Sequence, residues 1–226
     1  MDYLKFEQFV SKARLDKFLV GCGNDQEKAL ELYKSNIVIS KSFYPLLHLF
    51  EVFLRNRINT VLISHFGDAD WIRSQRMGFM NDITLKPSDY YLKKQISKTE
   101  TYLAKKTITI TSGKIISEQS LGFWTSFFET HHYRLLHGSI ISCFPLKPSP
   151  INRSSISIKL NRIRDFRNRV YHNEPICFKG AIVDYTEAET ILNDINDLLS
   201  WIDTELASYM QYFNDVSMRI AKAKKI

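Results

Sequence analysis

The feature that most constrains this chain is a strongly apolar stretch from Ser40 to Phe66. Large hydrophobic residues dominate it, and Pro45 falls near its expected first turn, where proline is tolerated. Gly67 follows directly and is typical of the residue that ends a helix. We therefore predict a core helix over residues 39–66.

Helical patterns also precede this stretch. Apolar residues recur close to helical spacing between Phe6 and Val20, and a glycine-rich break follows them. Asn24, with Glu27 three residues later, fits a capping box and predicts the start of a second helix. Residues 1–38 are therefore expected to hold N-terminal helices.

Residues 67–150 are expected to form an insertion of short helices and loops. Alternating Thr and Ile over residues 107–116 fit either a small hairpin or a loop. An aromatic segment also lies in the insertion. Its side chains suit core packing, and stacking on RNA bases is a second interpretation: Phe123, Trp124, Phe127 and Phe128.

The C-terminal part, residues 151–226, is expected to hold two longer helices. The first is basic, runs up to His172 and ends before Pro175, because the residue before a proline disfavours the helical conformation. The second runs from Tyr185 to Ala223, with apolar residues along one side.

Few helix breakers interrupt these patterns: the 226 residues include 8 Gly and 6 Pro. The chain is therefore predicted to be all-α, organised as one domain with a helical and loop insertion and a long C-terminal helix. Hydrophobic residues make up 44% of it, which is enough for a packed core and argues against disorder.

The chain is basic, with 31 Lys and Arg against 24 Asp and Glu and a formal charge of +7. An excess of this size suits a polyanionic partner such as RNA, DNA or an anionic membrane surface. The sequence contains neither a signal segment nor an uninterrupted apolar run of about 18 residues. We expect a cytoplasmic protein that does not enter a membrane.

Neither cysteines nor histidines form a pattern that indicates a metal site. The three cysteines are odd in number and lack the spacing of zinc ligands: Cys22, Cys143 and Cys177. Three histidines lie close in sequence, but no cysteine or acidic residue at suitable spacing accompanies them: His131, His132 and His137. No metal and no cofactor are therefore predicted.

The residues best suited to chemistry are Arg167, Asn168 and His172. RNA cleavage without a metal needs a group that takes the 2′-hydroxyl proton and a group that protonates the leaving 5′ oxygen. It also needs a cation that stabilises charge on the phosphoryl oxygens. Histidine transfers protons near neutral pH, and arginine offers a fixed cation with two donors for phosphate.

Helix geometry limits how one chain can use these residues. Arg167 and His172, five apart, point about 140° away from each other on an ideal helix, whereas Asn168 and His172 share a face. Either Arg167 curls round, or the helix loosens at its end. Chemistry with two proton transfers would be easier if two copies met across a two-fold axis. The non-catalytic alternative is a basic helix whose histidine lies in the last turn, where the helix dipole favours it.

Four segments together resemble the successive motifs of the Abi-like abortive-infection proteins, and they occur in the same order. They are Glu51–Ile58, Phe66–Trp71, Ser120–Trp124 and Arg167–Ile176. The resemblance covers roughly Arg14 to Trp201. It implies a helical bundle of the HEPN superfamily, commonly dimeric, with an RNase site composed of Arg and His from both copies.

The family's catalytic motif maps onto Arg167, Asn168 and His172. Further residues are expected to border the site or to contact RNA: Glu51, Arg55, Asn56, Arg57, Arg164 and Arg169. An ordinary helical ion pair is the alternative for Glu51 and Arg55, which are four apart.

The resemblance implies a metal-independent endoribonuclease in bacterial antiphage defence, with RNA as substrate and a homodimer as the working form. Some relatives also act with a structured non-coding RNA. Relatives paired with nucleotidyltransferase antitoxins often carry a Tyr where this chain has Glu174, which disfavours such an antitoxin. One alternative is a non-catalytic RNA-binding module, and another is a structural subunit of a defence or toxin–antitoxin complex.

Overall fold

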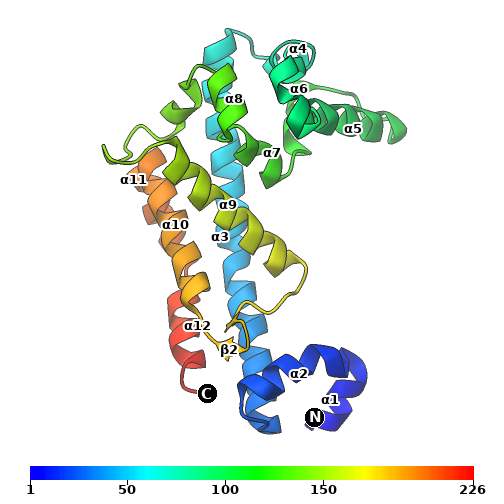
Figure 1. Ribbon diagram of the computed structural model, residues 1–226, viewed down its shortest axis with the longest axis vertical. Helices are drawn as coiled ribbons and strands as arrows, with labels where there is room; N and C mark the ends of the chain where they lie inside the picture. The colour runs from blue at the N-terminus through cyan, green and yellow to red at the C-terminus, as the bar shows by residue number, and fades with distance from the viewer. The chain divides into compact units, whose positions relative to one another are not determined.

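The computed structural model describes residues 1–226, and its regular structure is almost entirely helical (Figure 1). The only sheet pairs two short antiparallel strands, β1 (Phe178–Lys179) and β2 (Ile182–Val183). The predicted all-α fold is therefore confirmed.

The chain divides into two compact units that are each discontinuous in sequence. Unit 1 combines residues 1–49, 165–197 and 207–226, and unit 2 combines residues 50–164 and 198–206. The chain passes between the units four times, each time within a helix. These helices are α3 (Gln26–Phe66), α9 (Arg153–Tyr171), α10 (Thr186–Ile202) and α11 (Thr204–Gln211).

Helix α3 is continuous over 41 residues, whereas the sequence predicts two helices with a boundary between residues 38 and 39. Its first residues are capped by Asp25, whose side chain accepts a hydrogen bond from the Lys28 backbone N–H at 3.1 Å. The predicted cap, Asn24, instead has a positive φ of 66° and belongs to the preceding turn. Asn24 as the cap and a separate second helix are therefore wrong.

The predicted end of α3 is confirmed. Gly67 has a φ of +63°, and the Asp68 backbone N–H donates to the Ile63 carbonyl at 3.3 Å, which closes the helix as a left-handed cap does. Pro45 lies well inside α3 and not in a first turn, so one backbone hydrogen bond of the helix is missing there.

Helix α3 is also long and apolar enough over one window to cross a membrane, judged by length and composition alone. The core helix of a folded protein meets the same criterion. In unit 1 this helix buries Phe43, Leu46 and Leu47.

In unit 1, α1 (Tyr3–Val10) and α2 (Lys12–Gly21) fold beside the first part of α3 (Figure 1). The buried Phe18 ring lies edge-on to Tyr33 of α3 and to Phe178 of β1, with centroids 5.0 and 5.2 Å apart. Helix α12 (Val216–Ala223) lies beside the beginning of α10, where Lys224 and Glu189 form an ion pair at 2.6 Å.

The predicted single helix over residues 185–223 is wrong, because the chain breaks twice and forms α10, α11 and α12. At the first break, the Asp203 carboxylate accepts a hydrogen bond from the Glu205 backbone N–H at 2.8 Å. At the second, the Asn214 side chain accepts one from the Val216 N–H at 3.3 Å. Such local side-chain bonds compete with helical ones and start a new helix.

Unit 2 holds the insertion as a series of short helices. In chain order they are α4 (Trp71–Ser74), η1 (Phe79–Asn81), η2 (Ile83–Ser88), α5 (Tyr91–Lys105), α6 (Ser112–Ser117), α7 (Leu121–Ser126), α8 (Thr130–Leu135) and η3 (Ser139–Cys143). The Thr and Ile alternation forms no hairpin: residues 108–111 are irregular, and α6 follows.

The aromatic segment, formed by α7 and the two residues after it, lies in the core of unit 2, which confirms the packing interpretation. Its four large side chains are fully buried: Phe123, Trp124, Phe127 and Phe128. The Phe127 ring lies edge-on to buried Trp71, whose Nε1–H donates to the Asn59 side-chain oxygen at 2.8 Å. A buried indole N–H thereby finds its partner.

Candidate active site

The last turns of α9 carry the predicted catalytic residues, and buried side chains in the same turns anchor them. Phe166 and Val170 are buried, and the Phe166 ring packs edge-on against Phe43 of α3, with centroids 4.7 Å apart. Arg167 and Asn168 follow Phe166 and point away from this buried face of the helix. Arg167 is half-buried, and Asn168 is exposed.

His172 is the C-cap of α9, and the turn around it has a defined geometry. The Glu174 backbone N–H donates to the Arg169 carbonyl at 2.9 Å, and the Asn173 N–H donates to the Val170 carbonyl at 3.2 Å. Asn173 has a φ of +56°. These three features define a Schellman motif with Asn in the position that glycine usually occupies. The backbone that presents the exposed His172 is therefore fixed.

Arg169 ties this turn to its surroundings in unit 1. Its guanidinium forms an ion pair with Glu187 of α10, lies 3.8 Å from the Glu174 carboxylate and donates to the Pro175 carbonyl. Arg169 therefore has structural partners on both sides of the turn, which accounts for its position without RNA.

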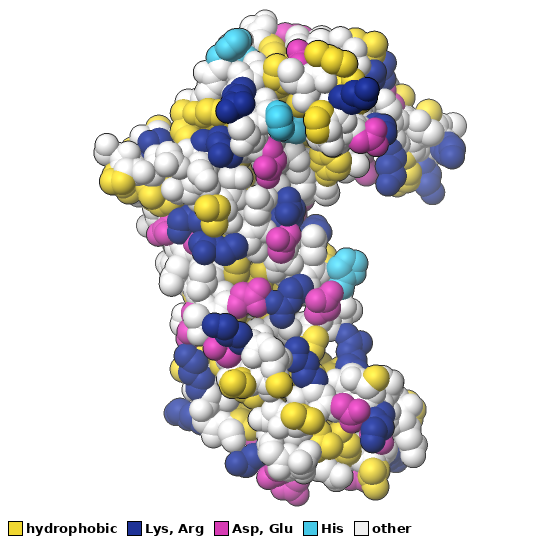
Figure 2. Space-filling model, in the orientation of Figure 1, with side chains coloured by type: hydrophobic (Ala, Val, Ile, Leu, Met, Phe, Trp, Pro, Cys, Tyr) yellow, Lys and Arg dark blue, Asp and Glu magenta, His cyan; other side chains and the backbone are white.

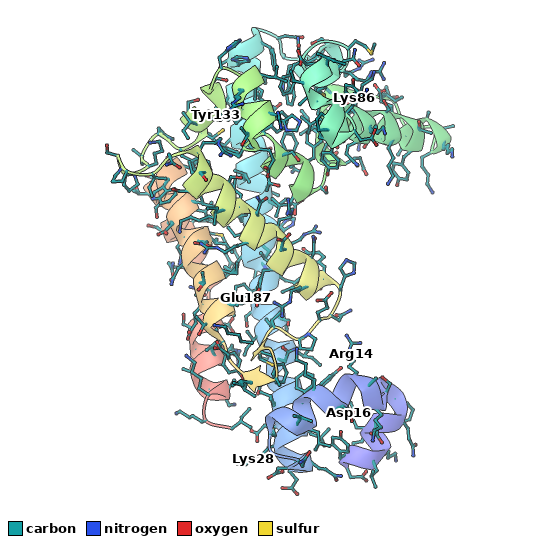
Figure 3. All side chains as sticks on the ribbon, viewed as in Figure 1. Arg14, Asp16, Lys28, Lys86, Tyr133 and Glu187 are labelled. Carbon is teal, nitrogen blue, oxygen red and sulfur yellow. The ribbon has the colours of Figure 1, made fainter.

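A second arginine supports the same turn from α2. Arg14 donates to the backbone carbonyl of Asn173. Figure 3 shows Arg14 directed from α2 towards the loop that follows α9, with Glu187 at the beginning of α10. The carbonyl of the left-handed residue thereby gains a charged donor.

Arg167 lies against an aromatic pair. Its guanidinium carbon is 4.1 Å from the centroid of the Tyr171 ring, one helical turn further on. The Tyr171 ring in turn stacks on Tyr44 of α3, with centroids 4.9 Å apart and an interplanar angle of 26°. Three flat groups are thus arranged in series, and the guanidinium is held by a cation–π contact.

The helix does not loosen before His172. The His172 backbone N–H still donates to the Asn168 carbonyl at 2.9 Å, as in a regular helix, and the backbone first departs from helical geometry at Asn173. Arg167 keeps the face of Tyr171, while His172 keeps the face of Asn168. Loosening as a way to unite Arg167 with His172 is therefore wrong, and the two-fold dimer stays a prediction.

Of the other predicted residues, only Arg169 belongs to unit 1. The rest belong to unit 2: Glu51, Arg55, Asn56, Arg57 and Arg164. Asn56 is exposed and the other four are half-buried. Unit 1 therefore brings together the three catalytic candidates and Arg169.

Two of the unit 2 arginines contact other elements of the same unit. Arg57 donates through Nε to the Cys143 carbonyl at 3.2 Å and through a terminal nitrogen to the Ser142 carbonyl at 2.9 Å. Arg164 runs past Gly122, where an added Cβ atom would lie 3.7 Å from its Cδ. The half-buried Arg57 thus links α3 to η3, which is a structural task.

The clustered histidines of unit 2 have separate environments, and no group of three or more His, Cys, Asp or Glu side chains is placed to hold a metal ion. His132 is buried, and its Nδ1 lies 2.8 Å from the Ser126 carbonyl, so Nδ1 carries the proton. Burial lowers the pKa of His132, an effect opposed by the hydrogen bond to Ser126. His131 and His137 are exposed.

Sequence reasoning missed Tyr44, Tyr171 and Arg14. Tyr171 had a local signal, because it lies one helical turn after Arg167 and can meet it. Tyr44 and Arg14 are distant from the motif in sequence, and no local pattern connects either of them to it.

The charged side chains are mixed on the face that Figure 2 shows, where Lys and Arg alternate with Asp and Glu. The formal charge of +7 is therefore not gathered into one basic patch on that face.

Comparison with protein-family models, curated protein sequences and solved structures finds no match to this chain.

Proposed function

We propose that this protein is a metal-independent endoribonuclease of the HEPN type that acts in antiphage defence, with Arg167, Asn168 and His172 as catalytic residues. The observation that supports it most directly is the exposed His172 on a fixed C-cap, directly after the turns that carry Arg167 and Asn168. Phosphodiester cleavage without a metal requires an accessible imidazole and a guanidinium, and the end of α9 supplies one of each on different faces.

The proposed reaction is an internal transfer. The RNA 2′-oxygen attacks the neighbouring phosphorus and loses its proton to a base, while the 5′ oxygen of the next nucleotide leaves and gains a proton from an acid. The products are a 2′,3′-cyclic phosphate and a 5′-hydroxyl end. His172 acts as the acid or base, Arg167 neutralises phosphoryl charge, and Asn168 orients His172 or the phosphate.

A homodimer supplies what one chain lacks. Two proton transfers need two groups, and each chain offers one motif histidine, on a different helix face from Arg167. A two-fold axis close to the ends of both α9 helices would place two histidines and two arginines around one phosphate. The defence role, and a structured non-coding RNA as a further partner, rest on the resemblance to Abi-like proteins.

The test is cleavage of end-labelled RNA in excess EDTA by the native protein, His172→Ala and Arg167→Ala. We expect cleavage by the native protein with 5′-hydroxyl ends, and a loss of about 10²- to 10⁴-fold in His172→Ala. His131→Ala is the matched control, because it removes another exposed histidine. Equal cleavage by native protein and His172→Ala would refute the assignment.

Tight RNA binding without cleavage, unchanged in His172→Ala, would favour the non-catalytic RNA-binding module. Phage infection of cells that carry the gene, with and without His172→Ala, tests the defence role and also covers a nuclease that needs infection as its trigger. Protection that survives His172→Ala would separate defence from RNA cleavage.

A further inference from the structure

Two tyrosines beside the motif are exposed, next to phenylalanines of the same helices that are buried. Tyr44 is 41% exposed and Tyr171 is 37% exposed, whereas Phe43 and Phe166 in the same turns are fully buried. The exposed pair is nevertheless ordered, because the rings stack on each other and Arg167 lies on Tyr171. The result is a flat aromatic surface held in place within one turn of His172.

Cationic and polar groups flank Tyr44 along α3. Lys41 precedes Tyr44 by three residues and His48 follows it by four, so all three share one stripe of the helix, and all three are exposed. No acidic residue occurs in α3 between Lys41 and His48. Beyond this segment, Glu51 follows His48 by three residues, and Asp215, which lies close to Ser42, is paired with Arg219 at 2.8 Å.

An aromatic ring flanked by a lysine and a histidine matches the chemistry of single-stranded nucleic acid. Bases stack on tyrosine faces irrespective of sequence, and nearby cations hold the phosphates between them. An exposed Tyr that merely packs on its neighbour would need neither the cationic flank nor the contact with the motif arginine.

We propose that Tyr44 is a base-stacking platform that positions single-stranded RNA for cleavage. One unpaired base stacks on Tyr44, Tyr171 supports that ring from within, and Lys41 contacts the backbone phosphate. The proposal rests on the proposed function, since it names the substrate as unpaired RNA and assigns Tyr44 a positioning role. It predicts weak dependence on base identity, with purines bound more tightly because their rings offer more area.

The test uses a short single-stranded RNA that is fully 2′-O-methylated, so that it cannot be cleaved, with 2-aminopurine as one base at successive positions. Stacking quenches 2-aminopurine fluorescence, and anisotropy of an end label gives the Kd. We expect quenching at one or two positions with native protein and with Tyr44→Trp. Tyr44→Ala should lose it and raise the Kd about 5- to 100-fold.

Two further variants separate stacking from a structural effect. Tyr44→Leu keeps an apolar cover over Tyr171 but removes the flat ring, so it should also lose quenching while folding normally. Tyr102→Ala is the matched control, because Tyr102 is 47% exposed on α5 of unit 2, and it should behave as native protein. Quenching and affinity that persist in Tyr44→Leu and Tyr44→Ala would overturn the proposal, as would failure of folded native protein to bind the RNA.

The same experiment separates this inference from the nuclease proposal. His172→Ala should bind and quench as native protein does, although it no longer cleaves unmodified RNA. Quenching that depends on Tyr44, in a protein that never cleaves RNA, would support the platform and refute the nuclease.

Discussion

The side-chain oxygen of Asn36 accepts a hydrogen bond from the backbone N–H of Ile176 at 2.9 Å, which joins α3 to the segment that follows the motif helix. Both residues are buried, and Asn36 is only 6% exposed. Asn36→Ala leaves a buried N–H without a partner, so we expect a loss of about 1–3 kcal/mol in the free energy of unfolding. Denaturant titration measures it, with exposed Lys34→Ala as the control; equal stability of both variants would contradict the role of this bond.

The left-handed Asn173 predicts a difference between two substitutions. Glycine adopts a φ of +56° without strain, whereas alanine in this region costs about 1 kcal/mol. Asn173→Gly should therefore keep native stability, and Asn173→Ala should melt at a lower temperature. Thermal unfolding of the two variants in parallel is the measurement, and a more stable alanine variant would count against the cap.

Removal of the Arg169 side chain should loosen the turn that presents His172. Arg169→Ala loses the contacts to Glu187, Glu174 and the Pro175 carbonyl, and we expect a destabilisation of about 2 kcal/mol. Arg169→Lys should recover only part of it, because lysine lacks the fork that serves several acceptors. Hydrogen exchange should become faster for the amides of Asn173 and Glu174.

Exposed Arg134→Ala is the control for that experiment. A double-mutant cycle with Glu187→Gln isolates the contribution of the Arg169–Glu187 pair. If Arg169→Ala left exchange in the turn unchanged, the turn would be held by its backbone bonds and Arg14 alone.

The buried His132 predicts a pH-dependent stability of the protein. Burial lowers its pKa in the folded state below the usual value of 6.5, and its Nε2 is buried without a hydrogen-bond partner. The unfolded chain therefore binds the proton more readily than the folded chain. The contribution of neutral His132 to the free energy of unfolding is complete above pH 6.5 and declines as the pH falls through the folded-state pKa. His132→Asn, whose amide can still donate to the Ser126 carbonyl, should show a smaller loss of stability between pH 7.5 and 5.5.

His131→Asn is the matched control for this prediction, since His131 is the exposed neighbour and should retain the native pH dependence. His65 contributes in the same direction, because burial and the nearby His137 lower its pKa. The pH dependence should therefore shrink in His132→Asn without vanishing. An unchanged slope would assign it to other groups.

The cysteines should react in two classes. Burial raises the pKa of Cys143 and of Cys177 to about 12, so both thiols are protonated and shielded at pH 8. Cys22 is half-buried, and burial raises its pKa as well. We expect one slow thiol in the native protein, lost in Cys22→Ser, and three thiols in denaturant. Three fast thiols in native protein would contradict the buried positions.

The sequence predicted the helical class and the motif helix well, because these depend on local periodicity and on breakers such as Gly67 and Pro175. Before residue 66 it misplaced the boundaries, because the helix predicted over Phe6–Val20 forms α1 and α2, and the next two predicted helices join in α3. After residue 185 it predicted too few helices. Short polar side chains set three of these helix starts: Asp25 caps α3 where Asn24 was expected, while Asp203 and Asn214 each start a new helix after α10 and α11.

The candidate site was predictable only along α9. Arg167, Asn168 and His172 lie within six consecutive residues, and their spacing on a helix already predicted that Arg167 and His172 lie on different faces. The stack of Tyr171 on Tyr44, by contrast, pairs residues far apart in the chain, and tertiary packing alone brings them together.

The four passages between the units, each inside a helix, carry a consequence for anyone who wishes to shorten this protein. Neither unit corresponds to a stretch of gene that can be expressed alone. A truncation after residue 164 removes Arg167 and His172, and it also strips unit 1 of everything except its first 49 residues. Limited proteolysis should not cut between the units, because the backbone at every passage is helical. A shorter version of this protein would therefore have to be built by rejoining distant segments with new loops, and not by trimming either end.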